Sequence, residues 1–356
     1  MEAVVLVGGQ GTRLQPLTLR TPKPMLPFAG VPFLTHQISR LRAVGVEHVV
    51  MATSYRAEVF HEHFGSGKDL GVRIDYVTET EPLGTGGGIR NVARRLESEP
   101  DDPVLVVNGD VLSGHDIRAQ LELHRRRDAA VTLHLVEVED ARPFGCVPTD
   151  SHARVTGFIE KSDDPVTNRI NAGCYVFARR IIDEIPADRP VSVERETFPG
   201  LLDAKATVLG YLDSSYWLDV GTPAAFVQGS ADVVRGVVVS PALPGPPGDS
   251  LIHDEALVHA SAVVSAGSVV GPRARIDAGA HVRGSVVADG VHIGAGAIVD
   301  RSIIGRRAVI GNHCSIHQAV VGEGARIGTG NELAAGIRVW TDAVIPDAAI
   351  RFSPLP

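Results

Sequence analysis

The sequence has few cysteines, and this limits both its chemistry and its compartment. Cys146, Cys174 and Cys314 are the three cysteines in 356 residues. They lie far apart and follow no metal-ligand spacing, so we expect neither a disulfide framework nor a cysteine-based metal centre. This pattern favours a reducing environment, and we expect a cytoplasmic protein.

An excess of basic residues and a long apolar segment are also missing. The formal net charge of -8 argues against a general nucleic-acid binder, which needs basic residues to neutralise phosphates. The N-terminus lacks a basic segment followed by a long apolar one, and no window reaches the length of a membrane span. We therefore expect neither nucleic acid nor a membrane among the partners.

The first part of the chain alternates between short apolar runs and segments with helical spacing. Runs at 3–7, 46–52, 72–77, 104–107 and 155–159 predict strands, while 33–44 and 85–96 predict helices. Apolar strands separated by helices are typical of a parallel sheet covered on both faces, which indicates an α/β, Rossmann-like domain. Ligands bind beyond the carboxyl ends of such strands, where Gly8, Gly9 and Asp110 stand.

A change of period marks a second domain. Residues 239–250 are rich in proline and glycine and predict a linker between domains at 1–238 and 251–356. Beyond it, apolar residues recur at every sixth position, with one contraction by a single residue. This period predicts a left-handed parallel β-helix of roughly five coils, with the apolar residues pointing inward. These residues are Val258, Val264, Val270, Ile276, Val282, Ile304, Ile310, Ile316, Ile327, Leu333, Val339 and Ile345.

A glycine-rich segment follows the first predicted strand. Residues 8–18 are GGQGTRLQPLT, and residues 21–26 are TPKPML. Glycines after a strand let backbone N–H groups approach a triphosphate, and Arg13 and Lys23 would add positive charge. The glycine spacing alone would also fit a tight strand-to-helix turn. No Gly-Lys-Ser/Thr triplet follows, so the segment differs from the common mononucleotide-binding loop.

These two runs together closely resemble the signature of the sugar-nucleotide pyrophosphorylases. Later segments fit the same family in the same order, over nearly the whole chain: TETEPLGT at 78–85, NGD at 108–110, FIEK at 158–161, INAG at 170–173 and WLDVG at 217–221. Residues 192–199 (SVERETFP) and the β-helix are similar to the mannose-1-phosphate guanylyltransferase branch, in particular its actinobacterial members. The resemblance implies a Mg²⁺-dependent nucleotidyltransferase that makes GDP-mannose and pyrophosphate from GTP and mannose 1-phosphate. Another hexose or a cyclitol 1-phosphate is the alternative acceptor.

The resemblance also implies roles for individual residues. Asp110 and Asp219 would hold Mg²⁺, which accepts few protein ligands, while Arg13, Lys23 and Lys161 would stabilise charge during the reaction. The implied nucleotide-binding residues are Leu6, Gly8, Gly9, Gly11, Thr12, Arg13, Glu79, Gly84, Thr85 and Asp110. The implied sugar-binding residues are Gly145, Glu160, Lys161 and Asn171. Ser162 stands where the family usually has proline, which leaves the shape of that loop open.

Taken singly, several of these residues also have simpler interpretations. An aspartate after a strand often forms a turn or caps a helix. An exposed Glu-Lys pair such as Glu160 and Lys161 is usually only solvated surface. Asn171 could instead satisfy backbone groups within its strand.

Glu79 suggests which base is bound. A carboxylate only accepts hydrogen bonds, and guanine presents two adjacent donors, whereas uracil and thymine present acceptors beside N3–H. Guanine is therefore the base expected at Glu79. A solvent-facing glutamate in an acidic segment is the alternative.

Two other functions share this predicted architecture. Hexapeptide β-helices also build acyltransferases, which need a catalytic histidine and a loop that breaks the repeat. His281, His292, His313 and His317 are present, but the repeat continues past them. A regulatory subunit without activity should lack charged site residues, yet Arg13, Lys23, Asp110, Lys161 and Asp219 are all present. We expect catalysis by the first domain and a homo-oligomer assembled through the β-helix.

Overall fold

The computed structural model describes residues 1–159, 161, 163–243 and 245–352. The chain forms two compact units. Unit 1 combines Met1–Gly9 with Gln37–Trp217, and unit 2 combines Gln10–His36 with Leu218–Pro356. Unit 2 therefore holds the glycine-rich segment from Gln10 onward together with the C-terminal coils. The domain boundaries at 238 and 251, which come from the sequence period, stay a prediction.

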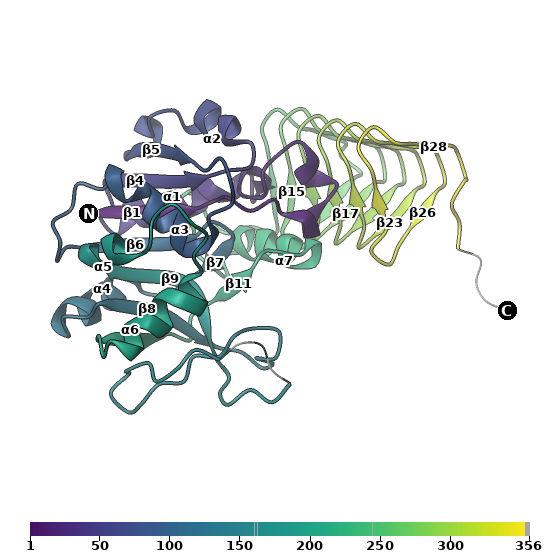
Figure 1. The fold of residues 1–356 in the computed structure, drawn as a ribbon. Helices are drawn as coiled ribbons and strands as arrows, with labels where there is room; N and C mark the ends of the chain where they lie inside the picture. The colour runs from purple at the N-terminus through teal and green to yellow at the C-terminus, as the bar shows by residue number, and fades with distance from the viewer. Residues whose placement is uncertain (160, 162, 244, 353–356) are drawn as a thin grey trace. The chain divides into compact units, whose positions relative to one another are not determined.

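Unit 1 is built on one seven-stranded sheet in the order β10-β8-β9-β6-β1-β4-β5 (Figure 1). The strands are β1 (Glu2–Leu6), β4 (His48–Thr53), β5 (Arg73–Thr78), β6 (Pro103–Asn108), β8 (Val131–Glu137), β9 (Arg169–Ala178) and β10 (Val208–Leu212). The sheet is mainly parallel, as predicted, but it is mixed, because β9 pairs antiparallel with both β6 and β8. The strand predicted at 155–159 is also absent. Val155 and Ile159 make isolated bridges to different partners, Thr149 and Cys146, so no continuous ladder forms.

Helices cover both faces of this sheet, as expected. Ile89 of α3 (Gly84–Val92), Ile182 of α5 (Arg179–Glu184) and Phe198 of α6 (Phe198–Asp203) share one core with Val131 and the alternate residues of β8. On the opposite face, the imidazole of His124 in α4 (Ile117–Arg126) lies 3.0 Å from the side-chain hydroxyl of Thr132. Alternating strand residues point to opposite faces, which places the two helix layers on different sides.

The remaining elements of the first 240 residues are short, apart from three helices. The helices are α1 (Phe33–Ala43), α2 (Ala57–Phe64) and α7 (Pro223–Val234), and the short strands are β2 (Pro27–Phe28), β3 (Val31–Pro32), β7 (Val111–Ser113) and β11 (Trp217–Asp219). The glycine-rich segment contains single 3-10 turns at Thr12–Leu14, Leu17–Leu19 and Lys23–Met25. In the described part of the chain, no helix combines the length and the apolar character needed to cross a membrane.

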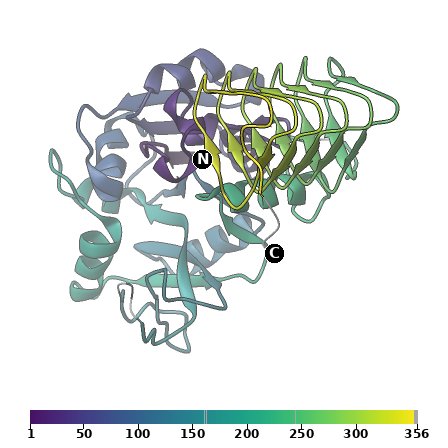
Figure 2. The same cartoon turned by 90° about the vertical axis from the view of Figure 1, so that its right-hand side faces the viewer.

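The C-terminal part of unit 2 is the expected left-handed β-helix, whose coils stack in Figure 2. Its first sheet holds β12 (Ser250–Ile252), β15 (Ser268–Val270), β18 (Val286–Val287), β21 (Ile303–Ile304), β24 (Val320–Val321) and β27 (Arg338–Val339). Its second holds β13 (Leu257–Val258), β16 (Arg275–Ile276), β19 (His292–Ile293), β22 (Val309–Ile310), β25 (Arg326–Ile327) and β28 (Val344–Ile345). Its third holds β14 (Val263–Ser265), β17 (His281–Arg283), β20 (Ile298–Asp300), β23 (Ser315–His317) and β26 (Glu332–Leu333). The stack is thus slightly longer than the five coils expected.

A column of buried serines explains why the period contracts. Successive coils place Ser285 above Ser268 and Ser302 above Ser285, each 17 residues further along the chain. The backbone N–H of each serine donates to the hydroxyl of the serine one coil earlier, at 3.1 and 3.0 Å. At Ser285 and Ser302 the corner between the third and first sheets is one residue shorter than the other corners, and the hydroxyls satisfy its buried backbone groups, whereas the first and last coils keep 18 residues.

The first sheet of the β-helix is apolar on its outer side as well as inside. Val270 and Ile304 belong to the interior core, whereas their neighbours Val269 and Ile303 point outward and are still buried. Helix α7 packs on β15, as Figure 1 shows. Residues of the glycine-rich segment line a small cleft together with Ile303. The glycine-rich segment and α7 therefore pack on the outer face of this sheet.

Candidate functional site

Three charged residues with expected catalytic or metal-binding roles come together in unit 2. The carboxylate of Asp219, at the end of β11, lies 3.7 Å from Nζ of Lys23 and 3.5 Å from Nη2 of Arg13. Lys23 is buried, so its charge needs such a partner. Arg13 is more open, with 62% of its side chain exposed. The group therefore presents one accessible and one enclosed cation to an anionic ligand.

Gly221 gives Arg13 its place in this group, and a separate feature of Asp219 suits a metal ion. The guanidinium of Arg13 fills the space where a side chain at Gly221 would lie, since a Cβ there would be 2.7 Å from Cζ of Arg13. In addition, Oδ1 of Asp219 is buried and accepts no hydrogen bond from any described residue. The ammonium of Lys23 lies 3.7 Å from this oxygen, beyond hydrogen-bonding distance, which leaves the oxygen able to coordinate a Mg²⁺ ion.

Asp110 lies in unit 1, in a turn held at both ends. It follows β6, as expected, and Gly109 donates its N–H to the carbonyl of Leu6 at the end of β1. Nε2 of Gln37 donates to the carbonyls of Asn108, at 3.0 Å, and of Val111, at 2.8 Å. Gln37 thus bridges the two sides of the turn. The sequence analysis missed this residue, because a lone glutamine in a helix gives no signal.

Glu79 also lies in unit 1, near two of the expected nucleotide-binding residues. It is half-buried, and Oε2 accepts the N–H of Leu83 at 3.3 Å. A Cβ at Gly88 would lie 2.7 Å from Oε1 of Glu79 and 3.7 Å from the side chain of Leu6, while one at Gly8 would lie 4.0 Å from Oε2. Burial raises the pKa of Glu79, and the hydrogen bond from Leu83 opposes that rise. One carboxylate oxygen therefore shapes the turn at 79–83, and the other faces the glycines of α3.

Other expected ligand residues bond within unit 1. The hydroxyl of Thr85 donates to Glu194 and accepts the N–H of Val193, so it connects α3 to the segment that precedes α6. The amide of Asn171 donates to the hydroxyl of Tyr175, at 2.8 Å, and its oxygen accepts the N–H of Gly173. The internal role that the sequence left open for Asn171 is therefore present. Trp217 donates its indole N–H to the carbonyl of Ala172, which anchors the residue two before Asp219.

The other expected residues are placed as follows. Gly84 begins α3, Gly9 ends the first segment of unit 1, and Gly11 and Thr12 precede Arg13 in unit 2. Gly145 lies beside the bridge between Cys146 and Ile159, and Lys161 is exposed. Glu160 lies outside the described residues.

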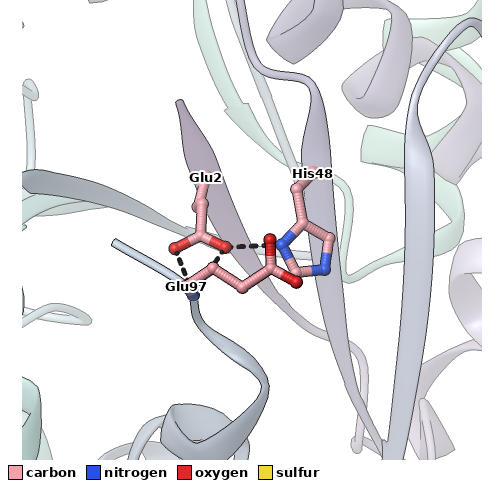
Figure 3. A group of neighbouring side chains, drawn as sticks. All are labelled: Glu2, His48 and Glu97. Carbon is pink, nitrogen blue, oxygen red and sulfur yellow. Dashed lines mark hydrogen bonds and ion pairs between the residues drawn. The ribbon is translucent and has the colours of Figure 1, made fainter. Parts of the chain in front are cut away.

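A second acidic cluster lies at the other end of the sheet, where β1 and β4 begin (Figure 3). Ligand atoms of Glu2, His48 and Glu97 lie within 4.8 Å of one another. Glu2 accepts Nδ1 of His48, at 2.5 Å, and the backbone N–H groups of Glu97 and Ser98. Because the carboxylate of Glu2 already accepts these hydrogen bonds, the cluster indicates a structural Glu2–His48 pair and not a metal centre.

The pKa values in this cluster agree with a charged pair. Burial raises the pKa of Glu2, but hydrogen bonds with His48, Ser98 and Glu97 lower it more, to about 2. Burial lowers the pKa of His48 and nearby Arg73 also opposes protonation, but hydrogen bonds to Glu2 and Asp75 raise it overall.

Comparisons with known proteins agree over both parts of the chain. A family model described as nucleotidyl transferase matches residues 2–236, and one described as the GMPPB C-terminal domain matches residues 247–351. A Mycobacterium tuberculosis protein named mannose-1-phosphate guanylyltransferase is 55% identical over 354 residues, which cover 99% of this chain and 98% of that protein. A Yarrowia lipolytica mannose-1-phosphate guanyltransferase is 38% identical over 232 residues, covering 65% of this chain and 63% of that protein. The solved structure of HddC from Yersinia pseudotuberculosis complexed with GMP-PN has a TM-score of 0.56 at 28% identity, covering 64% of this chain and 97% of that chain.

Proposed function

Because the chain belongs to the nucleotidyl transferase family, we propose that it joins GTP to mannose 1-phosphate, forming GDP-mannose and releasing pyrophosphate. The observation that carries this proposal is the 55% identity to the mycobacterial mannose-1-phosphate guanylyltransferase over nearly the full chain. The group formed by Arg13, Lys23 and Asp219 supplies the matching chemistry, since it offers charge for phosphate oxygens.

The reaction needs positioning and charge stabilisation more than acid–base catalysis. An oxygen of mannose 1-phosphate forms a bond to the α-phosphorus of GTP, and the bond from that phosphorus to the bridging oxygen of pyrophosphate breaks. A phosphate monoester is already an anion at neutral pH, so it needs no strong general base. Arg13, Lys23 and Lys161 bind phosphate oxygens and offset the negative charge that accumulates as pyrophosphate leaves.

Members of this family typically depend on a metal ion, and we propose that Mg²⁺ is the metal here. Asp110 and Asp219 are the carboxylates that would hold it. The Asp219 oxygen that accepts no hydrogen bond from a described residue supports this role. When bound, the ion neutralises triphosphate charge and acts as a Lewis acid. Two carboxylates plus substrate phosphates match the preference of Mg²⁺ for few protein ligands.

We further propose a cytoplasmic enzyme that self-associates through its β-helix. Leu257, Trp340 and Val344 of the β-helix are exposed by 70, 52 and 69%, and a second copy could cover them. The three cysteines are free and buried. Sedimentation of the purified chain tests the assembly.

A panel of triphosphates against sugar 1-phosphates tests the function. Pyrophosphate release should be fastest with GTP and mannose 1-phosphate, and the nucleotide-sugar product should be identified by mass spectrometry. Faster release with another acceptor, such as a different hexose or a cyclitol 1-phosphate, would replace mannose while retaining the reaction class. Absence of release with every pair would contradict the enzyme assignment.

A further inference from the structure

We propose that the β-helix supports and positions residues 10–36, the phosphate-binding segment, so that Arg338 and Asp342 are positioning residues for Arg13 and Lys23. This inference rests on the proposed function for its catalytic consequence, but not for its structural content. All the residues involved belong to unit 2.

Side chains of the β-helix reach the segment between the two catalytic cations. Nη1 of Arg338, in β27, donates to the carbonyl of Gln15 at 2.9 Å, two residues after Arg13. Nη2 of Arg20 donates to Asp342 at 2.7 Å, and Nη2 of Arg306 donates to the hydroxyl of Thr21, also at 2.7 Å. Three residues between Arg13 and Lys23 in the sequence are therefore hydrogen-bonded to side chains of the β-helix.

Two of the three contacts, those of Arg20 and Arg306, belong to one charge network around Glu323. Glu323 lies between coils, with 15% of its side chain exposed. It pairs most closely with Arg307 of the preceding coil, and also with Arg306 at 3.6 Å and with Arg20 at 3.9 Å. Single exposed ion pairs stabilise little, but a partly buried carboxylate shared by three arginines restricts all of them. The network therefore joins the segment to the coils more firmly than isolated pairs would.

Apolar contacts determine where the segment rests. Leu17 and Leu26 of the segment line one small cleft with Phe226 of α7 and Ile303 of β21. Leu251 also lies against the segment, since a Cβ at Gly30 would be only 2.8 Å from it. Residues 269, 286, 303 and 320 form the buried outer column of this sheet. Phosphate binding usually uses a short loop braced by its own helix; here 3-10 turns are braced by a separate structure.

The test compares hydrogen exchange with kinetics in the full-length chain. The amides of Leu14, Gln15 and Leu19, which lie between Gly11 and Lys23, make 3-10 hydrogen bonds and report the order of the segment directly. In Arg338→Gln and in the combined Arg338→Gln and Asp342→Asn variant, exchange of these amides should become at least about fivefold faster, because the charged donor to Gln15 is lost in both and the carboxylate that pairs with Arg20 is lost in the second. The KM for GTP should rise about tenfold, and the KM for mannose 1-phosphate should change less. Arg338→Lys, which keeps a charged donor, should recover part of both losses.

The matched control is Arg273→Gln. Arg273 also pairs across coils, with Asp289 and Glu255, but these partners lie outside residues 10–36. It should leave exchange and KM values as in the wild type. Unchanged exchange in the combined variant would overturn the proposal, and so would faster exchange with unchanged KM values for GTP. If the wild type failed to make GDP-mannose, the proposed function would fail, while the exchange measurement would still decide whether the β-helix orders the segment.

Discussion

The ammonium of Lys23 lies 3.7 Å from one oxygen of Asp219, and the guanidinium of Arg13 lies 3.5 Å from the other oxygen. One carboxylate thus separates two cations and leaves this group with an excess of one positive charge. A polyanionic ligand would bind the cations, and a divalent ion would bind the carboxylate. The same three side chains can therefore pair with one another before substrate arrives and with substrate and metal afterwards.

Asp219→Asn should lower turnover by about a hundredfold or more, since a charged metal ligand becomes a neutral one of equal size. Asp110→Asn should have a comparable effect, and both variants should need more Mg²⁺ for half-maximal rate. Pyrophosphate release as a function of Mg²⁺ concentration measures this. Asp203→Asn, at the exposed end of α6, is the control and should behave as the wild type. Near wild-type rates at saturating Mg²⁺ would remove the altered aspartate from the metal site.

Glu79→Gln should weaken the preference for GTP over dTTP by about tenfold or more. An acceptor for the guanine donors becomes an amide that can donate to a pyrimidine, and a charged hydrogen bond is worth about 1.5–3 kcal/mol. Competition between GTP and dTTP at fixed Mg²⁺ gives the ratio. Glu81→Gln, in the same acidic segment, is the matched control. An unchanged ratio would mean that another group reads the base, and that Glu79 serves mainly the hydrogen bond to Leu83.

The sequence was most informative where one residue type had to recur. Val270, Ile276 and Val282 had to be apolar because they fill the narrow interior of the coils. The doublets 269–270, 286–287, 303–304 and 320–321 also showed that one outer face is covered, a signal that the sequence analysis did not use. Which segment covers that face could not be predicted, because the contact of Arg338 with Gln15 joins residues 323 positions apart without any pattern.

For the candidate site as well, residues within a recognisable sequence pattern were predicted, and residues that act through long-range backbone contacts were not. Arg13, Lys23 and Asp219 were expected and do come together. Gln37 contacts the Asp110 turn through backbone carbonyls. Every residue type has such a carbonyl, so the sequence around Asp110 could not predict this contact. The antiparallel insertion of β9 was missed for a similar reason, because strand direction depends on how the long connection at 138–168 returns to the sheet.

His48 should make stability depend on pH in the neutral and alkaline range. Since its pKa is raised above the ordinary 6.5, its stabilising contribution is present below about pH 6.5 and is lost as pH rises through the folded-state value. The Glu2 contribution, with a pKa of about 2, stays constant above pH 4.5 and disappears only as pH falls toward 2. Denaturant unfolding at pH 6, 7, 8 and 9 should therefore show the difference between wild type and His48→Gln shrinking as pH rises. His61→Gln, exposed on α2, should show a constant difference; a constant difference for His48→Gln would contradict the charged pair.

Ser285→Ala should destabilise the β-helix by about 1–3 kcal/mol, because the buried N–H of Ser302 loses its acceptor. Ser315→Ala is the control, since its half-buried hydroxyl pairs with the imidazole of His317 in the same strand. Thermal unfolding monitored by circular dichroism compares the two variants. Equal melting temperatures for both would mean that the serine column contributes no more than surface hydroxyls do.

The 17-residue length of the middle coils has a consequence for changes in chain length. Removing residues 288–304, one whole coil, would leave a continuous solenoid with its inward residues still stacked, since the coils in this part of the stack repeat after 17 residues. It would also shift Arg338 by one strand spacing, about 4.8 Å, along the axis. The guanidinium would then no longer stand level with the carbonyl of Gln15. The hydrogen bond from Arg338 to the carbonyl of Gln15 therefore constrains the number of coils, whereas folding of the β-helix alone would permit a shorter or a longer stack.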